Sequence, residues 1–413
     1  MPNAGLADDT IGTRKQQVLL GFALFAVAYA AQTTSPVLLF YTIDLDLTTT
    51  VLTLFFSVYA VGLVIAFLFG GSQSDRRGRK RVIVPSIALL ALAIIALFAA
   101  AAWGERMILV ARFLQGVTSG AVFTVGTVWM RELAGTKNAA RAAMRASGIM
   151  AVGFAVGPFI SGSLVEWAPW PKILSFVIAL VLVLIALVIV RGLPETMTEH
   201  RPGRIQIGVP KGNGLGFLLY LLPCGLLVYT FAMLSLIAFP IQLGKAGFVQ
   251  VYFLLGVSAL LVQGFAAIAT IWARRLGPAN AGWLAGLAGA LGCALGYLAV
   301  QPDGWLWIIP ASVVIGVAGG LSLTSGVTVS DMLAPVERRG ALISMFYIVV
   351  YFGYASPTLI SLVGGKATLE HGASIFGLGI VAFVMMLVLA IPGRSLIIRH
   401  EAQLKQAASP TSH

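Results

Sequence analysis

The sequence predicts an all-α polytopic membrane protein whose twelve transmembrane helices form two pseudo-symmetric six-helix bundles. The first observation is composition: of 413 residues, 59% are hydrophobic and 10% are charged, whereas a soluble domain carries roughly 25% charged residues. The second is that apolar stretches of roughly 18 residues or more recur between short polar interruptions, as transmembrane helices require. The third is a repeated pattern of glycines and acids in the two halves.

Each predicted span is long enough to cross ~30 Å of hydrocarbon at about 1.5 Å per residue. In order, the spans cover residues 17–40, 50–72, 82–103, 106–131, 142–165, 171–191, 215–240, 249–273, 279–300, 305–330, 340–363 and 372–392. The longest polar interruption follows the sixth span. We therefore expect an N-terminal six-helix bundle (1–191), a cytoplasmic linker (192–214) and a C-terminal six-helix bundle with a short cytoplasmic tail (215–413).

The two halves of the sequence align with each other, and matching residues fall at corresponding helix positions. One constant shift places Gly78 on Gly277, Gly120 on Gly319, Glu132 on Asp331, and Gly157-Pro158 on Ser356-Pro357. Parallel six-helix repeats are typical of alternating-access transporters, whose site lies between the halves at mid-membrane.

Basic residues are distributed unevenly among the loops. Of the 27 lysines and arginines, Arg112 lies inside a span, and one set of alternate loops holds only Arg106, Lys172, Lys245 and Lys366. The positive-inside rule then places both termini in the cytoplasm. The net charge of +12 reflects this topology, so we expect no nucleic-acid partner. Asp8, Asp9 and the long apolar run that follows them argue against a cleavable signal peptide.

Metal and cofactor chemistry is not expected. Cys224 and Cys293 fall within predicted spans, which favours packing cysteines over a disulfide or a metal pair. The four histidines fall in loops or tails, and no metal-ligand spacing or nucleophile elbow is present. We therefore expect neither a cofactor nor an enzyme.

The polar run GGSQSDRRGRKR, residues 70–81, separates the second and third spans. Gly71 and Gly78 permit close helix approach and a tight turn, and Asp75 can accept hydrogen bonds from helix N-termini or pair with basic neighbours across the interface. With Arg76 and Arg79, these three residues are the candidate gating motif. A topological anchor would explain the arginines but not the acid and the glycines, so we expect a gating loop. The second-half counterpart, ARRLGPA at 273–279, has no acid, which predicts a weaker latch.

The fourth span contains an arginine several residues from its end. Burying Arg112 in the bilayer costs on the order of 3 kcal/mol or more, which makes it a functional candidate. Gln115 and Ser119 share its helix face, and Gly116 and Gly120 make the adjacent face small enough for close packing. Snorkelling of Arg112 to the interface is the alternative.

The fifth span has a series of small residues: Gly148, Gly153, Gly157, Pro158 and Gly162. Spaced glycines would let this helix approach its partner in the other half, and Pro158 would bend it. A general glycine packing face is the alternative interpretation.

These three motifs resemble those of the major facilitator superfamily. The run from Gly71 resembles its loop 2–3 motif G-x-L-x-D-R-x-G-R-K/R, with Gln73 in place of leucine; the others resemble its helix-4 motif R-x-x-Q-G-x-x-x-G and its antiporter motif, whose core is G-x-x-x-G-P-x-x-x-G. The chain is most similar to the twelve-helix drug:proton antiporter branch. The resemblance implies the major facilitator fold and a monomer in a bacterial-type inner membrane that exports drugs or small amphipathic metabolites in exchange for protons; uptake of a small polar metabolite is the alternative.

The resemblance also implies that helices 1, 4, 7 and 10 line a substrate cavity, flanked by helix 11. The corresponding candidates are Tyr29, Gln32, Thr33, Gln115, Phe123, Tyr229, Met233, Tyr347, Tyr351 and Tyr354. The three helix-11 tyrosines follow i, i+4, i+7 and form an aromatic stripe with hydroxyl tips. Interhelix packing is an equally good interpretation of that stripe.

The proton carrier expected from the resemblance has no obvious counterpart. The first span has no acid, although many relatives place one there. The remaining candidates are Asp75 in the gating motif and four acids at helix ends: Asp44, Asp46, Glu132 and Asp331. Ion pairs of the inner-end acids with Arg131 or Arg338 are the alternative, and a facilitator or another coupling ion stays open.

Overall fold

The computed structural model describes residues 12–44, 47–197, 208–245, 247–335, 338–359 and 373–408. Within these ranges, twelve helices are long and apolar enough to cross a membrane, which confirms the predicted number of spans. The first six are continuous: α1 (Arg14–Asp44), α2 (Thr49–Arg77), α3 (Arg79–Trp103), α4 (Glu105–Ala134), α5 (Ala139–Trp167) and α6 (Pro171–Gly192).

The second six spans contain more irregular turns. The seventh is a composite of α7 (Gly214–Gly216), a π-helical turn (Phe217–Leu221), α8 (Leu222–Met233), the π-helical turn η3 (Leu234–Ala238) and α9 (Phe239–Lys245). It is followed by α10 (Val251–Leu276), α11 (Pro278–Ala299), α12 (Ile308–Leu333), and α13 (Arg339–Phe352) with the 3-10 turn η6 (Gly353–Ala355). The last is α16 (Ala373–Val388), a π-helical turn at Leu389–Gly393, and α17 (Arg394–Ala408).

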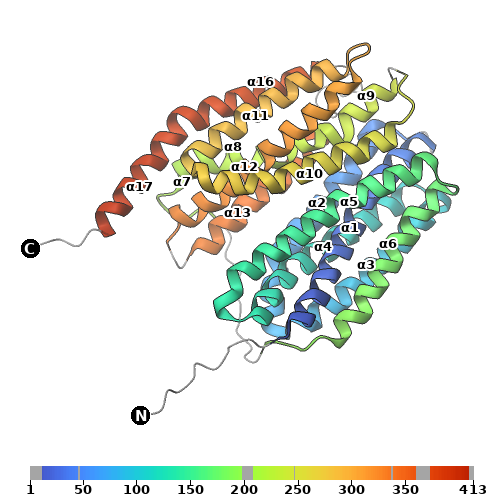
Figure 1. The fold of residues 1–413 in the computed structure, drawn as a ribbon, viewed down its shortest axis with the longest axis horizontal. Coiled ribbons are helices and arrows are strands. Elements are labelled where there is room, and N and C mark those ends of the chain that lie inside the picture. Colours follow the sequence, from blue (N-terminus) through green and yellow to red (C-terminus); the bar gives the residue numbers. More distant parts are fainter. Residues whose placement is uncertain are drawn as a thin grey trace, which may run out of the picture.

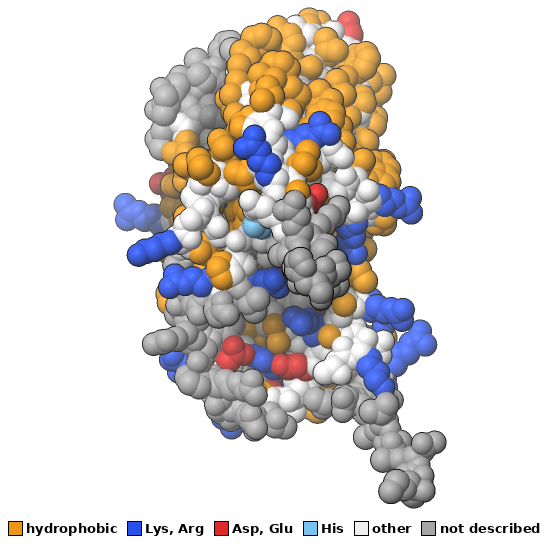
Figure 2. Space-filling model, turned by 90° about the vertical axis from the view of Figure 1, so that its left-hand side faces the viewer, with side chains coloured by type: hydrophobic (Ala, Val, Ile, Leu, Met, Phe, Trp, Pro, Cys, Tyr) orange, Lys and Arg blue, Asp and Glu red, His pale blue; other side chains and the backbone are white. Residues whose placement is uncertain are grey.

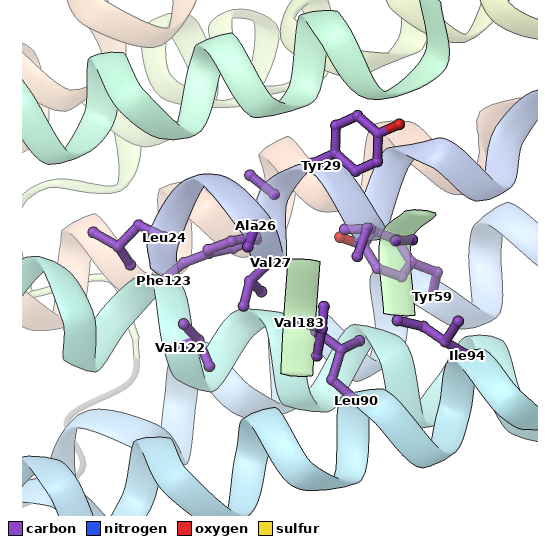
Figure 3. Close-up of a cluster of buried hydrophobic side chains, with 14 of the residues drawn as sticks. Leu24, Ala26, Val27, Tyr29, Tyr59, Leu90, Ile94, Val122, Phe123 and Val183 are labelled. Carbon is purple, nitrogen blue, oxygen red and sulfur yellow. The ribbon is translucent and has the colours of Figure 1, made fainter. Parts of the chain in front are cut away.

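The helices form two bundles that lie side by side (Figure 1). Helices α1 to α6 surround one hydrophobic core and the later spans surround a second. In the first core, Val27, Leu90 and Val183 pack between α1, α3 and α6, Leu24 lies beside Phe123 of α4, and the ring of Tyr29 projects from another side of α1 (Figure 3). The most extensive contact between the bundles joins α5 and α10, and a smaller one joins α2 to α13 and η6.

The two ends of the bundles differ in charge. We call the end at which α1 begins and α2 ends the termini end, and the opposite end, with Asp44 and Glu166, the far end. In Figure 1 the termini end lies to the left, and Figure 2 shows that lysines and arginines gather on that face. The loops in which the sequence concentrates lysine and arginine therefore lie at the termini end.

The helices are longer than predicted, and one difference changes the interpretation of a motif. Helix α2 continues through Arg77 and α3 begins at Arg79, so Gly78 is the single residue between them. Its φ of 100° lies in the left-handed region, which favours glycine. The expected loop over residues 70–81 is therefore wrong: the motif forms the last turns of one helix, a one-residue turn and the first turn of the next.

The two bundles repeat one glycine contact at a slightly different register. A Cβ at Gly116 would lie 2.1 Å from the carbonyl oxygen of Tyr59, and one at Gly120 would lie 3.1 Å from that of Leu63, so these glycines allow α4 to touch α2. In the second bundle, a Cβ at Gly316 would lie 2.4 Å from the carbonyl oxygen of Val262, and one at Gly320 would lie 2.1 Å from that of Ala266, both on α10. The structural counterpart of Gly120 is thus Gly320, and the expected match to Gly319 is off by one residue.

Candidate functional site

A buried arginine organises the termini end of the first bundle. The Nη1 atom of Arg79 donates to Asp75 Oδ1 (2.5 Å) and Ser74 Oγ (2.6 Å), and Nη2 donates to Glu132 Oε1 (2.8 Å). The hydroxyl of Thr196 donates to the other oxygen of Glu132 (2.5 Å). We call these five residues the Arg79 cluster. It joins α2, α3, α4 and the segment after α6, so its charge pairing holds the four together.

The segment after α6 also satisfies the start of α3. The carboxylate of Glu195 accepts hydrogen bonds from the backbone N–H groups of Arg79 (2.9 Å) and Lys80 (3.0 Å). A carboxylate at a helix N-terminus is stabilised by the free N–H groups and the helix dipole. A Cβ at Gly78 would lie 2.6 Å from Glu195 Oε2, so the turn has to be glycine for space as well as for its φ angle.

A second buried arginine lies in the interior of the first bundle. Arg112 is 1% exposed, and its guanidinium donates to the carbonyl oxygens of Phe55 (3.3 Å) and Ala31 (3.4 Å) and to Gln115 Oε1 (2.5 Å). Its Cζ atom lies 4.3 Å from the centre of the Tyr59 ring, a cation–π distance. All these partners are neutral.

Gln115 connects this arginine to α1. Its amide nitrogen donates to the carbonyl oxygen of Ala30 (2.9 Å) and to Thr34 Oγ1 (3.1 Å). We call Arg112, Gln115, Thr34 and Tyr59 the Arg112 cluster. Since its members come from α1, α2 and α4 and bond across the helices, the side chain does not snorkel: it points into the bundle.

At the far end, α5 of the first bundle touches α10 of the second without intervening side chains. A Cβ at Gly162 would lie 2.3 Å from the carbonyl oxygen of Tyr252, and one at Gly256 would lie 2.7 Å from that of Pro158. Glu166 Oε2 accepts hydrogen bonds from the backbone N–H groups of Tyr252 (3.1 Å) and Phe253 (3.3 Å). An acid on one bundle thus caps a helix of the other.

A narrow pocket lies where the bundles meet, and we call it the central pocket; its free volume is about 10 Å³, room for roughly one water molecule. It is lined by Gln32, Phe154, Pro158, Tyr229, Ala232, Met233, Leu236, Ala259, Val262, Gln263 and Tyr354. The Gln32 amide donates to the Tyr354 hydroxyl across the bundles (3.4 Å). Met233 and Leu236 flank the start of the π-helical turn η3, and such turns are frequent at functional sites. The lining combines aromatic, thioether and amide groups, and none of the described residues that form it is charged.

The sequence profile of the Major Facilitator Superfamily matches residues 20–358. The chain belongs to the major facilitator superfamily. It is thus a multi-pass membrane transporter rather than an enzyme, and members of this superfamily bind small-molecule substrates.

Two further comparisons agree with this assignment. The chain is similar to multidrug resistance protein MdtL of Shewanella sp. (strain ANA-3), with 35% identity over 118 residues, 29% of each chain. It is similar to MdtL of Escherichia coli (strain K12 / DH10B), with 30% identity over 130 residues, 32% of this chain and 33% of the relative. The chain therefore matches only about a third of the length of these relatives.

Solved transporters share the fold. A peptide transporter POT in complex with sulfate superposes with a TM-score of 0.78 at 13% identity, covering 97% of this chain and 99% of that one. The nucleoside transporter NupG superposes with a TM-score of 0.71 at 14% identity, covering 92% and 98%. At this identity the likeness shows the major facilitator fold alone.

Within this superfamily fold, the predicted gating residues divide into two groups. Asp75, Gly78 and Arg79 form or shape the Arg79 cluster. Arg76 is exposed and has no ion-pair partner in the described part of the chain, and a Cβ at Gly71 would meet no atom within 4 Å. The expected close helix approach at Gly71 is therefore wrong.

The glycines of the antiporter motif also serve different neighbours. Gly153 and Gly157 face the backbone of α1 within the same bundle, with Cβ distances of 2.7 Å to the carbonyl oxygens of Phe25 and Tyr29. Gly148 is exposed and meets nothing within 4 Å. Only Gly162 and Pro158 contact the other half, so the expectation that the whole series approaches it is wrong.

The cavity candidates are spread over four positions. Gln32, Tyr229, Met233 and Tyr354 line the central pocket, and Phe123 packs edge-on against its Phe154, with ring centres 5.3 Å apart. Gln115 lies behind, in the Arg112 cluster. Tyr347 and Tyr351 instead stack on Phe67 (6.1 and 5.1 Å). Tyr29 and Thr33 are buried on α1, and neither hydroxyl has a hydrogen-bond partner in the described residues.

The described proton-carrier candidates, Asp44, Asp75, Glu132 and Asp331, do not line the central pocket. Glu132 pairs with Arg79 rather than Arg131, and Asp331 pairs with Arg339 (3.4 Å) rather than Arg338, which corrects both expected partners. Asp44 is exposed at the far end, and Asp46 lies outside the described residues.

Sequence reasoning missed Glu166, Glu195 and Gln263. Glu166 lies near the end of α5 and Glu195 lies after α6, and each accepts hydrogen bonds from the first backbone N–H groups of a helix distant in sequence. Gln263 had a usable signal, since a single amide within the apolar stretch of α10 is costly in a membrane and marks a candidate site.

Proposed function

We propose that this chain is a proton-coupled efflux antiporter of the drug:proton branch, which exports drugs or small amphipathic metabolites by alternating access. The observation that carries the proposal is the central pocket: a cavity lined from both bundles by aromatic rings, a methionine and amides suits amphipathic molecules of varied shape. The multidrug resistance names of the partial relatives support the same substrate class.

Alternating access requires contacts between the bundles that can break, and bundles that move as rigid units. At the far end, Glu166 caps α10 and Gly162 touches its backbone, so α5 and α10 form the closed gate. At the termini end, the Arg79 cluster holds α2, α3 and α4 as one rigid body, which lets the first bundle rock as a unit. The substrate then occupies the central pocket between the two movements.

The topology we propose follows the charges. The termini end, where lysines and arginines gather, faces the cytoplasm across a bacterial-type inner membrane. The bundles then correspond to residues 1–191 and 215–413, joined by a cytoplasmic linker at 192–214. A monomer contains the whole pocket, because both of its walls come from one chain.

Transport by the purified protein in proteoliposomes tests this function. With an imposed pH gradient, we expect accumulation of amphipathic compounds against their concentration gradient, and loss of accumulation when a protonophore collapses the pH gradient. Protein-free liposomes are the matched control. Unchanged flux after collapse would exclude proton coupling, and proton-driven movement of small polar solutes alone would favour the uptake alternative.

A further inference from the structure

The charge balance of the membrane interior is unusual. Among the described residues, the only buried charged side chains are Arg79, 7% exposed, and Arg112, 1% exposed, and no aspartate or glutamate is buried. Arg79 is neutralised by two carboxylates. Arg112 has only carbonyl, amide and ring partners. The interior of the first bundle therefore holds one positive charge without a counter-ion among the described residues.

This charge lies close to the central pocket. The guanidinium of Arg112 is stacked on Tyr59, and the Tyr59 ring packs edge-on against Tyr354, with centres 6.3 Å apart. Tyr354 lines the pocket and accepts the hydrogen bond from Gln32. One pair of aromatic rings thus separates the guanidinium from the space that a substrate would occupy.

The low dielectric constant of the protein interior lets the charge of Arg112 act on the central pocket from behind the two rings. Buried charges interact more strongly than exposed ones and are screened little by salt. The pocket itself contributes no carboxylate, so nothing in its lining cancels the positive potential. A bound cation would be repelled, and an anion would be attracted.

We propose that the substrate is an aromatic molecule that carries no positive charge, and that affinity falls in the order carboxylate, neutral, ammonium. The aromatic part is recognised by Tyr229 and Tyr354, whose ring centres lie 4.4 Å apart, and the charge is selected by Arg112. This inference rests on the proposed function, because it names the substrate class of the same pocket.

Binding to the purified protein in nanodiscs, without any gradient, tests the order directly. One biaryl scaffold bearing a carboxylate, a primary amide or a trimethylammonium group supplies three probes of similar shape. We expect the carboxylate to bind about tenfold more tightly than the trimethylammonium probe, also at high salt. Equal or tighter binding of the ammonium probe would overturn the inference while leaving proton-coupled efflux intact; a failed pH-gradient experiment would leave the binding order unaffected.

Variants of Arg112 test whether this residue causes the preference for negatively charged probes. Arg112→Lys keeps the charge and should keep the order, whereas Arg112→Gln should remove it. Gln32→Glu introduces an acid at the pocket and should reverse the order even if Arg112→Gln fails to fold. Arg275→Gln, at an exposed position in the last turn of α10, is the matched control and should change nothing. A folded Arg112→Gln protein with the wild-type order would contradict the proposal.

Discussion

Arg79 and Arg112 are both buried, yet their surroundings give them different roles. The guanidinium of Arg79 bonds to two carboxylates at a helix end, so its charge is neutralised and its geometry is fixed. The guanidinium of Arg112 bonds to neutral acceptors in the bundle interior, so its charge remains available to act on the pocket. The first arginine is suited to holding helices together, and the second to selecting a substrate.

The Arg79 cluster can be tested with a neighbouring arginine as control. Arg79→Gln leaves Glu132 and Asp75 without their cation, and breaking such a partly buried network typically costs about 3 kcal/mol. We expect transport in proteoliposomes to fall at least tenfold. Arg76→Gln removes the same charge from an exposed position three residues earlier and should stay within twofold of wild type. Similar losses in the two variants would show that total charge, rather than the cluster, matters.

Which residues of these clusters could be predicted depended on where the partners lie in the chain. Asp75, Arg79 and Arg112 stand out because a charge beside or inside an apolar span is costly. The distant residues around Arg79 are Glu132, Thr196 and Glu195, which lie 53 or more positions away in the sequence. Only the folded chain brings them together. Arg76 belongs to the same sequence motif but is exposed on another face of α2. Gly71 lies one turn before Asp75 on the same face, but it has no side chain with which to join the cluster.

Helix α5 shows that glycines of one motif can have separate structural roles. Gly153 and Gly157 allow contact with α1, Gly162 allows contact with α10, and Gly148 allows none. The spacing predicted a small-residue face, but not which neighbour it meets. The π-helical turns in the seventh and last spans were likewise unpredicted, because apolar periodicity carries no signal for one extra residue in a turn.

Alanine substitutions separate these roles. A Cβ at Gly162 would lie 2.3 Å from the carbonyl oxygen of Tyr252, so Gly162→Ala should push α5 from α10 and hinder closure of the far end. Gly148→Ala adds the same methyl group in open space and should improve helix stability by about 1 kcal/mol. We expect far-end cysteine labelling to rise several-fold in the first variant only. Equal labelling in both variants would contradict the proposed gate.

The two bundles share an architecture, but the second bundle has no counterpart of the Arg79 cluster among the described residues. Gly277 ends α10 as Gly78 ends α2, and both have a positive φ. Gly78 is followed by Arg79, whereas Gly277 is followed by Pro278. Proline has no hydrogen-bond donor that could replace the guanidinium. The acid at the end of α12, Asp331, instead forms an exposed pair with Arg339. The repeat was visible in the sequence, and so was the absence of an acid in its second copy; the loss of the organising arginine became clear only from the fold.

Opening and closing of the whole molecule depends on contacts between the bundles, and Glu166 offers a direct test. Its carboxylate caps α10 across the far end, and a charge at a helix N-terminus contributes about 1 kcal/mol. Glu166→Gln keeps the shape but removes the charge, so it should raise the ratio of far-end-open to far-end-closed molecules about fivefold.

Electron–electron distances between spin labels at Trp167 and Val249 report this ratio, because both side chains are exposed at the far end of α5 and just before α10. We expect Glu166→Gln to increase the population with long distances. Glu105→Gln, which removes an exposed charge at the start of α4 at the same end, should leave the distribution unchanged. An unchanged distribution in Glu166→Gln would mean that backbone packing at Gly162 and Gly256 closes the far end without help from the carboxylate.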